Sequence, residues 1–306
     1  MSSKAGLRFV LDRPERPGAV APSAPESKVG VAYDTAWARR YPVRLARALL
    51  LDDLTLPITR AICRPLIEGA EQLDRLDGPA IFAANHASHL DTTLLLACLP
   101  PKMRHKTIVA AAADYFFDTR AKAALQAGFF NSIPMERMRV NRRSADIAAA
   151  LIEEGWNLLV FPEGGRSRDG WGEEFKGGAA YLAKRCDVPV VPIHLHGTRA
   201  ILAKGSLRLR PGKAEVRFGP PVRPRPEDDA RRFSVQVERA VAALSDEAET
   251  DWWSARRRLA AGSTPSLRGP DVSPWRRSWD LSSARGGHPR ARSRAGAKWP
   301  FNERTD

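Results

Sequence analysis

Short apolar runs alternate with longer segments of helical periodicity from residue 79 to residue 249. Two helical patterns are clear: 142–154, bounded by Asn141 as N-cap and Gly155 at its end, and 226–249. Five apolar runs have the length of β-strands: 80–84, 107–111, 157–161, 189–194 and 214–218. Strand, helix, strand repetition is typical of α/β proteins. The sequence therefore predicts an α/β fold with a mixed, largely parallel sheet flanked by helices.

An amphipathic segment at residues 41–67 precedes this domain. Arginines are mixed with its apolar positions, and we expect Pro57 to break or kink it into two helices. The apolar members are Val43, Leu45, Leu49, Leu50, Leu54, Ile58, Ile62 and Leu66. A basic amphipathic helix can lie in a bilayer interface, or it can pack on a protein core. The residues alone leave both alternatives open.

Both ends of the chain differ in composition from its centre. Residues 1–32 contain repeated Pro and Gly without an apolar period, which predicts a disordered leader. The helical segment at 33–77 and the α/β domain at 78–253 would follow it. Residues 254–306 carry a net charge of +8, with Trp275, Trp279, Trp299 and Phe301 among the cations. This predicts a basic disordered tail that contacts an interface or a single nucleic-acid strand, or that only aids solubility.

The composition excludes several classes of protein. Three widely spaced cysteines match neither a disulfide framework nor a zinc site, which favours a reducing compartment. No apolar run approaches the roughly 18 residues of a membrane span, and no secretory signal is expected. The net charge of +14 indicates an anionic partner: nucleic acid, anionic lipid or a phosphorylated substrate.

The loop after the first predicted strand, residues 85–91, reads Asn-His-Ala-Ser-His-Leu-Asp. His86 and Asp91 would lie on different faces of an uninterrupted helix, so their pairing needs a break between them. Ser88 can supply it, because Ser88 and Asp91 form a capping-box pattern that would start a helix and leave His86 in the loop. Asp91 could then hold one imidazole nitrogen while the other takes a proton from a bound hydroxyl. The loop thus predicts a His-Asp general base.

Three alternatives remain for this loop. Asp91 could be only a helix cap, with His86 as a turn residue. His86, His89 and Asp91 could bind a metal, although their spacing is poor and no further ligands are apparent, so no metal or cofactor is expected. Ser88 or Cys98 could be a covalent nucleophile, but Cys98 lies in an apolar run and Ser88 lacks the Gly-x-Ser-x-Gly setting.

The loop after the third predicted strand, residues 161–167, reads Phe-Pro-Glu-Gly-Gly-Arg-Ser. Its glycines allow several backbone N–H groups to point at an anion, and Arg166 offers a planar fork that matches a phosphate. An alternative is that Glu163 and Arg166 simply pair across the turn. The predicted phosphate site comprises Arg137, Glu163, Gly164, Gly165, Arg166 and Lys176. The substrate is therefore expected to be phosphorylated.

These loops resemble the motifs of the glycerolipid acyltransferases. Residues 86–91 are similar to the His-x4-Asp block of that family, and residues 161–167 resemble its Phe-Pro-Glu-Gly-x-Arg-Ser block. Two weaker blocks also appear in the family's order: one at 128–137, between the two strong blocks, and one at 191–197, after them. The resemblance is strongest to the 1-acylglycerol-3-phosphate acyltransferases and covers about residues 78–221.

The resemblance implies a reaction and its partners. His86, oriented by Asp91, would deprotonate a glycerol hydroxyl that attacks the thioester of acyl-CoA or acyl-carrier protein. The arginine block and Arg137 would hold the acceptor phosphate of 1-acylglycerol-3-phosphate, giving phosphatidic acid; glycerol 3-phosphate or another lysolipid is an alternative acceptor. Gly165 stands where the family commonly has Thr, so the headgroup preference stays open.

The resemblance also implies a place in the cell. Family members commonly sit on the membrane through N-terminal helices, which favours a peripheral or monotopic protein on an anionic cytoplasmic membrane face. The basic tail is not part of the family pattern. Nucleic-acid binding through this tail is the alternative from another functional class, and it is not expected.

Overall fold

The computed structural model describes residues 29–137, 142–167, 169–206, 208–270, 272 and 276. Its centre is a seven-stranded sheet with the strand order β1-β7-β6-β2-β5-β3-β4. The strands are β1 (Leu66–Glu68), β2 (Ile81–Ala84), β3 (Thr107–Ala112), β4 (Ser132–Met135), β5 (Asn157–Val160), β6 (Val190–His196) and β7 (Glu215–Phe218). All neighbouring pairs are parallel except β6 and β7. The predicted mixed, largely parallel sheet is confirmed.

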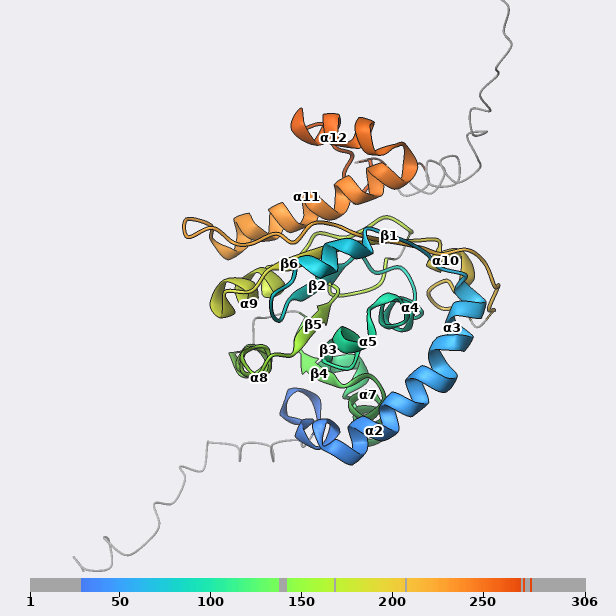
Figure 1. Cartoon of the computed structure of the whole chain (residues 1–306), viewed down its shortest axis with the longest axis vertical. Helices are drawn as coiled ribbons and strands as arrows, with labels where there is room; N and C mark the ends of the chain where they lie inside the picture. Colours follow the sequence, from blue (N-terminus) through green and yellow to red (C-terminus); the bar gives the residue numbers. More distant parts are fainter. Residues whose placement is uncertain are drawn as a thin grey trace, which may run out of the picture.

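Helices cover both faces of this sheet (Figure 1). The longer ones are α2 (Tyr41–Leu49), α3 (Leu56–Cys63), α4 (Asp91–Cys98), α7 (Arg120–Phe130), α8 (Arg142–Glu153), α9 (Gly178–Cys186), α11 (Ala230–Glu249) and α12 (Trp252–Ala260). Single turns form α5 (Pro101–Arg104), α6 (Ala113–Phe116) and α10 (Thr198–Ile201). Three short 3₁₀ segments are η1 (Gly30–Ala32), η2 (Ala36–Arg39) and η4 (Ala70–Arg75).

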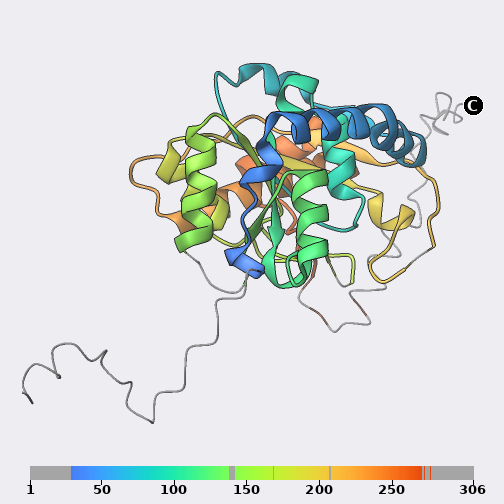
Figure 2. The ribbon, with the colours of Figure 1, turned by 90° about the horizontal axis from the view of Figure 1, so that it is seen from below.

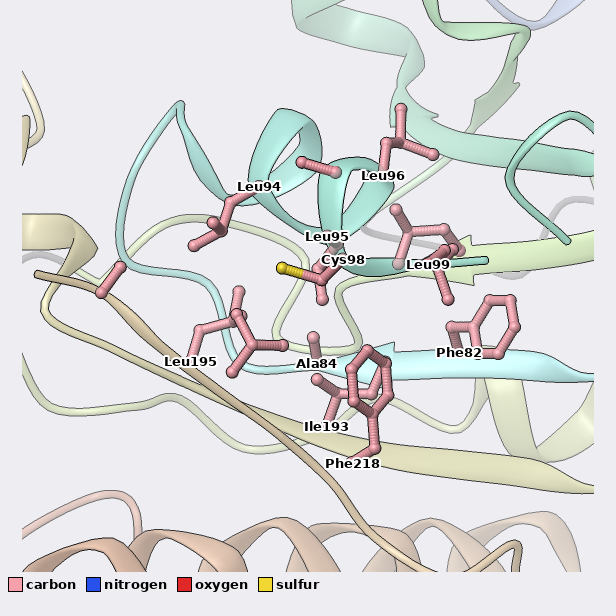
Figure 3. Packing of buried hydrophobic residues seen from close by; sticks show 14 of the residues in the cluster. Phe82, Ala84, Leu94, Leu95, Leu96, Cys98, Leu99, Ile193, Leu195 and Phe218 are labelled. Atoms are coloured by element: carbon pink, nitrogen blue, oxygen red, sulfur yellow. The ribbon is translucent and has the colours of Figure 1, made fainter. Parts of the chain in front are cut away.

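Each face of the sheet has its own apolar core. On one face, leucines of α4 pack over Phe82, Ile193 and Phe218 from β2, β6 and β7 (Figure 3). On the other face, α8, α9 and α11 pack on β2, β5 and β6. Because β2 is buried on both faces, its four residues are all apolar, as is typical of a central parallel strand.

Two strands that the sequence did not predict lie at the two edges of the sheet. β4 contains Pro134, whose missing N–H is tolerated on an edge strand. β1 has only three residues, two of them exposed, so it lacks a recognisable alternation. Residues 66–67, predicted as helix, therefore belong to β1.

The predicted pair of amphipathic helices is present as α2 and α3, which form one helical rod from residue 41 to residue 63 and meet at a π-helical turn rather than at a break at Pro57. A π-helical turn, η3 (Leu50–Thr55), joins α2 to α3 immediately before Pro57, the second residue of α3. Figure 2 shows the rod (blue) on the outer surface of the molecule. Along it, Tyr41, Leu45, Leu49, Leu50, Leu54 and Ile58 are exposed.

The two predicted disordered ends are ordered where the structure describes them. Gly30 at the end of the predicted leader donates its backbone N–H to the Phe117 carbonyl at 2.7 Å. The tail was predicted to begin at residue 254, but this position lies inside α12, which packs against α11. Residues 1–28, and the tail beyond 270 except 272 and 276, lie outside the described residues, as do Asn141 and the four predicted tail aromatics.

Candidate active site

The two motif loops lie side by side at the carboxyl edge of the sheet. β2 and β5 are parallel neighbours, so the loops that follow them emerge together. The Ser167 N–H donates to the His86 carbonyl at 2.9 Å and joins the loops directly. The Asn85 side chain bonds both the N–H and the carbonyl of Leu195 on β6, which fixes the start of the first loop.

The predicted pairing of His86 with Asp91 is present. His86 Nδ1 lies 2.8 Å from Asp91 Oδ2, and the Asp91 side chain is fully buried. The same oxygen accepts the backbone N–H groups of Ala87 and Ser88 at 2.7 and 2.8 Å. Three donors therefore fix the carboxylate, which in turn fixes the imidazole and leaves Nε2 as the ring nitrogen outside this pairing.

The chain is not helical between His86 and Leu90, as predicted, but Ser88 is not the N-cap of the helix that follows. α4 begins at Asp91 with Leu90 as N-cap, and Ser88 Oγ donates instead to the Leu202 carbonyl at 2.7 Å. Ser88 is fully buried and committed to this bond. Burial raises the pKa of Cys98 to about 12, so neither side chain is placed as a nucleophile.

A cavity of about 400 Å³ opens beside His86. The His86 ring stacks on Phe161, with the ring centroids 4.0 Å apart. Apolar side chains from β3, β5 and α9 line one part of the cavity: Val109, Ala111, Leu158, Val160, Ala179 and Leu182. Cations line another part: Arg137, Arg166, Lys176 and Lys204. The cavity can hold a molecule with an apolar portion and an anionic group, with His86 at its wall.

Glu163 has a different position from the one predicted, because its carboxylate does not face the cations of the cavity. It is 4% exposed, and its two oxygens accept the backbone N–H groups of His86 at 2.9 Å and Glu173 at 3.1 Å. Burial raises the pKa of Glu163 to about 8, while these two N–H donors favour the ionised form. Glu163 links the His86 loop to the 169–175 loop, and its carboxylate oxygens are engaged by these two N–H groups rather than by Arg166.

Arg137 and Lys176 lie together over the glycine turn. Arg137 Nη1 donates to the Gly164 carbonyl at 3.3 Å, and Lys176 Nζ donates to the Arg137 carbonyl at 2.8 Å. Gly164 has a positive φ of 73°, and a Cβ there would lie 2.7 Å from Lys176 Nζ. The turn therefore requires glycine at this position. Gly165 also lines the cavity.

Arg137 is held by a carboxylate that the sequence analysis missed. Its guanidinium makes a two-point contact with Asp114 on α6, with Nε 3.0 Å from Oδ1. The hydrogen bonds from Arg137 keep the pKa of Asp114 below its ordinary value. Asp114 lies 23 residues before Arg137, so no local pattern announces the pair.

Arg166 carries an unused donor. Its Nη1 atom is buried and has no hydrogen-bond partner among the described residues. Lys204 Nζ donates to the Arg166 carbonyl at 2.8 Å, which brings a second missed residue to the cavity. His89 also lines the cavity, and burial lowers its pKa, with Arg166 adding to the effect. Arg166 itself lines the cavity, and a guanidinium there is well suited to an anion.

No group of three or more metal-binding side chains occurs among the residues that the structure describes. Of the three residues in the metal alternative, His86 and Asp91 are paired with each other, and His89 lines the cavity.

Comparison with known proteins shows which proteins this chain is similar to. The acyltransferase family model matches residues 64–196. The chloroplastic 1-acyl-sn-glycerol-3-phosphate acyltransferase BAT2 of Brassica napus is 33% identical over 143 residues, covering 46% of this chain and 39% of the relative. The human 1-acyl-sn-glycerol-3-phosphate acyltransferase alpha is 27% identical over 178 residues, covering 56% and 61%.

A solved structure has the same fold. The 1-acyl-sn-glycerophosphate acyltransferase PlsC of Thermotoga maritima superposes with a TM-score of 0.54 at 23% identity, covering 72% of this chain and 88% of the other. The chain spans less than two thirds of the length of the curated relatives named above. The family model covers both motif loops. Residues 64–196 thus match the acyltransferase family model, and the relatives that are similar over part of the chain are 1-acyl-sn-glycerol-3-phosphate acyltransferases.

Proposed function

We propose that this protein transfers a fatty acyl group from an acyl thioester, acyl-CoA or acyl-carrier protein, to the free hydroxyl of 1-acylglycerol-3-phosphate, giving phosphatidic acid. The observation that carries the proposal is the His86–Asp91 pair, with an Nδ1–Oδ2 distance of 2.8 Å, at the wall of a cavity that combines an apolar lining with four cations. The similarity to 1-acyl-sn-glycerol-3-phosphate acyltransferases supports the choice of acceptor.

His86 is the general base of this proposal. Asp91 holds Nδ1, so Nε2 takes the proton of the acceptor hydroxyl as its oxygen attacks the thioester carbonyl carbon. The new C–O bond forms, the C–S bond breaks, and the departing thiolate receives the proton from His86. Because a thiolate is a good leaving group, positioning and proton transfer account for the reaction without a covalent enzyme intermediate.

The cations receive the acceptor phosphate. Arg166 lines the cavity directly after the glycine turn, and Arg137 and Lys176, which also line it, lie against Gly164 of that turn. Asp114 fixes the orientation of the Arg137 guanidinium before the substrate binds. Substrate binding therefore costs less side-chain entropy. The apolar lining from β3, β5 and α9 then suits an acyl chain.

The test of the proposal is a thiol-release assay with the full chain and an acyl-CoA. The acceptors are lysophosphatidate, glycerol 3-phosphate, lysophosphatidylcholine and monoacylglycerol, with donor-only hydrolysis as the blank. Release that depends on lysophosphatidate, with phosphatidic acid detected as the product, is the expected result. Release that depends only on another acceptor would replace the acceptor assignment, and no acceptor-dependent release would refute transfer.

Replacing Arg166 with Ala should raise KM for lysophosphatidate ~10–100-fold and change kcat by less than about threefold, since a charge-assisted hydrogen bond to the phosphate contributes roughly 1.5–3 kcal/mol. Its effect on monoacylglycerol, which has no phosphate, should be small. Arg210→Ala, an exposed arginine in the loop after α10, is the control. Equal losses with both acceptors would contradict the phosphate role of Arg166.

We also propose that the exposed stripe of the α2–α3 rod rests on a membrane. Leucine and isoleucine side chains on one surface can enter the acyl boundary, while the exposed Arg40 and Arg64 at the two ends can meet lipid phosphates. No helix among the described residues has the length and apolarity to cross a bilayer. This contact would deliver a lysolipid to the cavity without exposing its chain to water, which costs about 0.8 kcal/mol per CH₂.

Leu49→Glu should weaken binding to phosphatidylglycerol-containing vesicles about tenfold or more, because a 57% exposed leucine loses its insertion and gains a charge of the same sign as the lipid. Val235→Glu on α11, where the valine is 40% exposed, is the matched control. Vesicle sedimentation measures both. Equal binding of the two variants would place the membrane contact elsewhere.

A further inference from the structure

The segment after α12 returns to the domain and packs beside the 169–175 loop. We call residues 264–270 the strap. The Leu267 carbonyl accepts the Gly172 N–H at 2.8 Å, and the Leu267 side chain packs against the core formed by α8, α9 and α11. Arg268 Nε lies 3.4 Å from Glu238 on α11. The strap lies outside the residues that the family model matches.

Gly269 fits the strap against one aromatic ring. Its φ is +69°, and a Cβ at this position would lie 2.3 to 2.6 Å from ring atoms of Trp171. Contacts this short force either the strap or the indole to move. Gly262, in the turn after α12, has nearly the same φ, +68°, but no atom lies within 4 Å of its would-be Cβ. The two glycines therefore differ in the contact with Trp171 and not in backbone conformation.

The 169–175 loop connects the strap to the base. The Gly170 N–H donates to Ser167 Oγ at 2.7 Å, and Ser167 N–H bonds the His86 carbonyl at 2.9 Å. On a second route, Glu163 accepts the N–H of Glu173 and the N–H of His86 through its two oxygens. Glu238 closes the arrangement, because one of its oxygens accepts the Phe175 N–H while the other faces Arg268.

We propose that the strap is a positioning element for catalysis: by bracing the 169–175 loop, it holds the two hydrogen-bonded routes that fix the His86 backbone. The kinetic part of this inference rests on the proposed acyl transfer. The inference gives a role to residues that follow α12, which lie outside the acyltransferase motifs. Gly269 and Leu267 act through Trp171 and Gly172 and do not touch the cavity.

Gly269→Ala tests the strap, with Gly262→Ala as the matched control. Both variants place an alanine at a similar positive φ, and the clash with Trp171 should lower the melting temperature of Gly269→Ala further than that of Gly262→Ala. Only Gly269→Ala should lower kcat, by ~10-fold or more. A displacement of His86 by about 1 Å or less is enough to slow proton transfer to this extent. KM for lysophosphatidate should stay within about threefold, since the cations keep their contacts. Trp171→Leu in the Gly269→Ala background should restore part of kcat by relieving the clash.

Hydrogen exchange gives a readout that does not depend on activity. In Gly269→Ala, the amides of peptides covering 169–175 and 85–88 should exchange faster than in Gly262→Ala. Faster exchange confined to the strap, or equal kcat in the two variants, would overturn the positioning role. If the wild-type chain shows no acyl transfer, hydrogen exchange still tests whether the strap stabilises the 169–175 and 85–88 segments. The acyl-transfer proposal and the strap proposal can therefore be refuted independently.

A second pair of variants covers the case in which Gly269→Ala does not fold. Arg268→Ala removes the contact with Glu238 without changing the backbone, and Arg257→Ala on α12 is an exposed arginine control. Faster exchange at 169–175 and a lower kcat in Arg268→Ala alone support the strap. Identical behaviour of the two arginine variants opposes it.

Discussion

Replacement of His86 by Ala should lower kcat for acyl transfer by ~10²–10⁴-fold, the usual contribution of a general base. KM for lysophosphatidate should change little, because Arg137, Arg166 and Lys176 remain. The measurement is thiol release at saturating donor with varied acceptor. A loss in kcat without a loss in binding is the signature of a group that acts only in the transition state.

His105→Ala provides a matched control. His105 Nε2 pairs with Asp52 Oδ2 at 2.9 Å, and its side chain is 32% exposed, so it is also a histidine held by an aspartate. It does not line the cavity. Turnover should be close to that of the wild type. Wild-type turnover in His86→Ala, or equal losses in both variants, would contradict the assignment of the base.

Two substitutions at Asp91 should separate its charge from its geometry. In Asp91→Ala, the Ala87 and Ser88 N–H groups lose their acceptor inside the protein, so the free energy of unfolding should fall by about 2–4 kcal/mol. The kcat should fall nearly as far as in His86→Ala, because the imidazole is no longer oriented. Urea unfolding and thiol release measure the two effects.

Asp91→Asn can keep an oxygen at the Oδ2 position and so retain all three hydrogen bonds to it. It loses the negative charge that stabilises the imidazolium, so kcat should fall ~10–100-fold with a smaller loss of stability. Equal kcat in Asp91→Asn and the wild type would show that the carboxylate serves only the fold.

The central strands and the two motif loops could be predicted because their determinants are local. A buried parallel strand such as β2 reads as a short apolar run, and the loops carry several unusual residues in a row. The edge strands β1 and β4 could not be predicted, because β1 is too short to show an alternation and β4 contains Pro134. The continuity of the rod through Pro57 depends on the π turn, which the Pro rule alone does not anticipate.

The site was predicted less completely, for a similar reason. The His86–Asp91 pair spans five residues, and the spacing argument was enough. Asp114 contacts Arg137, and Lys204 lines the cavity, through contacts with residues 23 and 38 positions away in the chain, which no local pattern predicts. Glu163 was grouped with its neighbours by motif, although a buried carboxylate bonded to two backbone N–H groups cannot also serve an anion.

The π turn in the rod has a consequence for how this surface tolerates insertions and deletions. Leu45 and Leu49 before the turn are four residues apart, as are Leu54 and Ile58 after it, whereas Leu49 and Leu54 are five apart, and the wider π turn absorbs the extra residue. Deleting one residue between 50 and 55 would swing the first half of the rod by about 100° relative to the second. Arg47 would then lose its hydrogen bonds to the carbonyls of Ala38 and Gly128. The length of the turn is therefore constrained both by the exposed apolar side chains and by the buried Arg47.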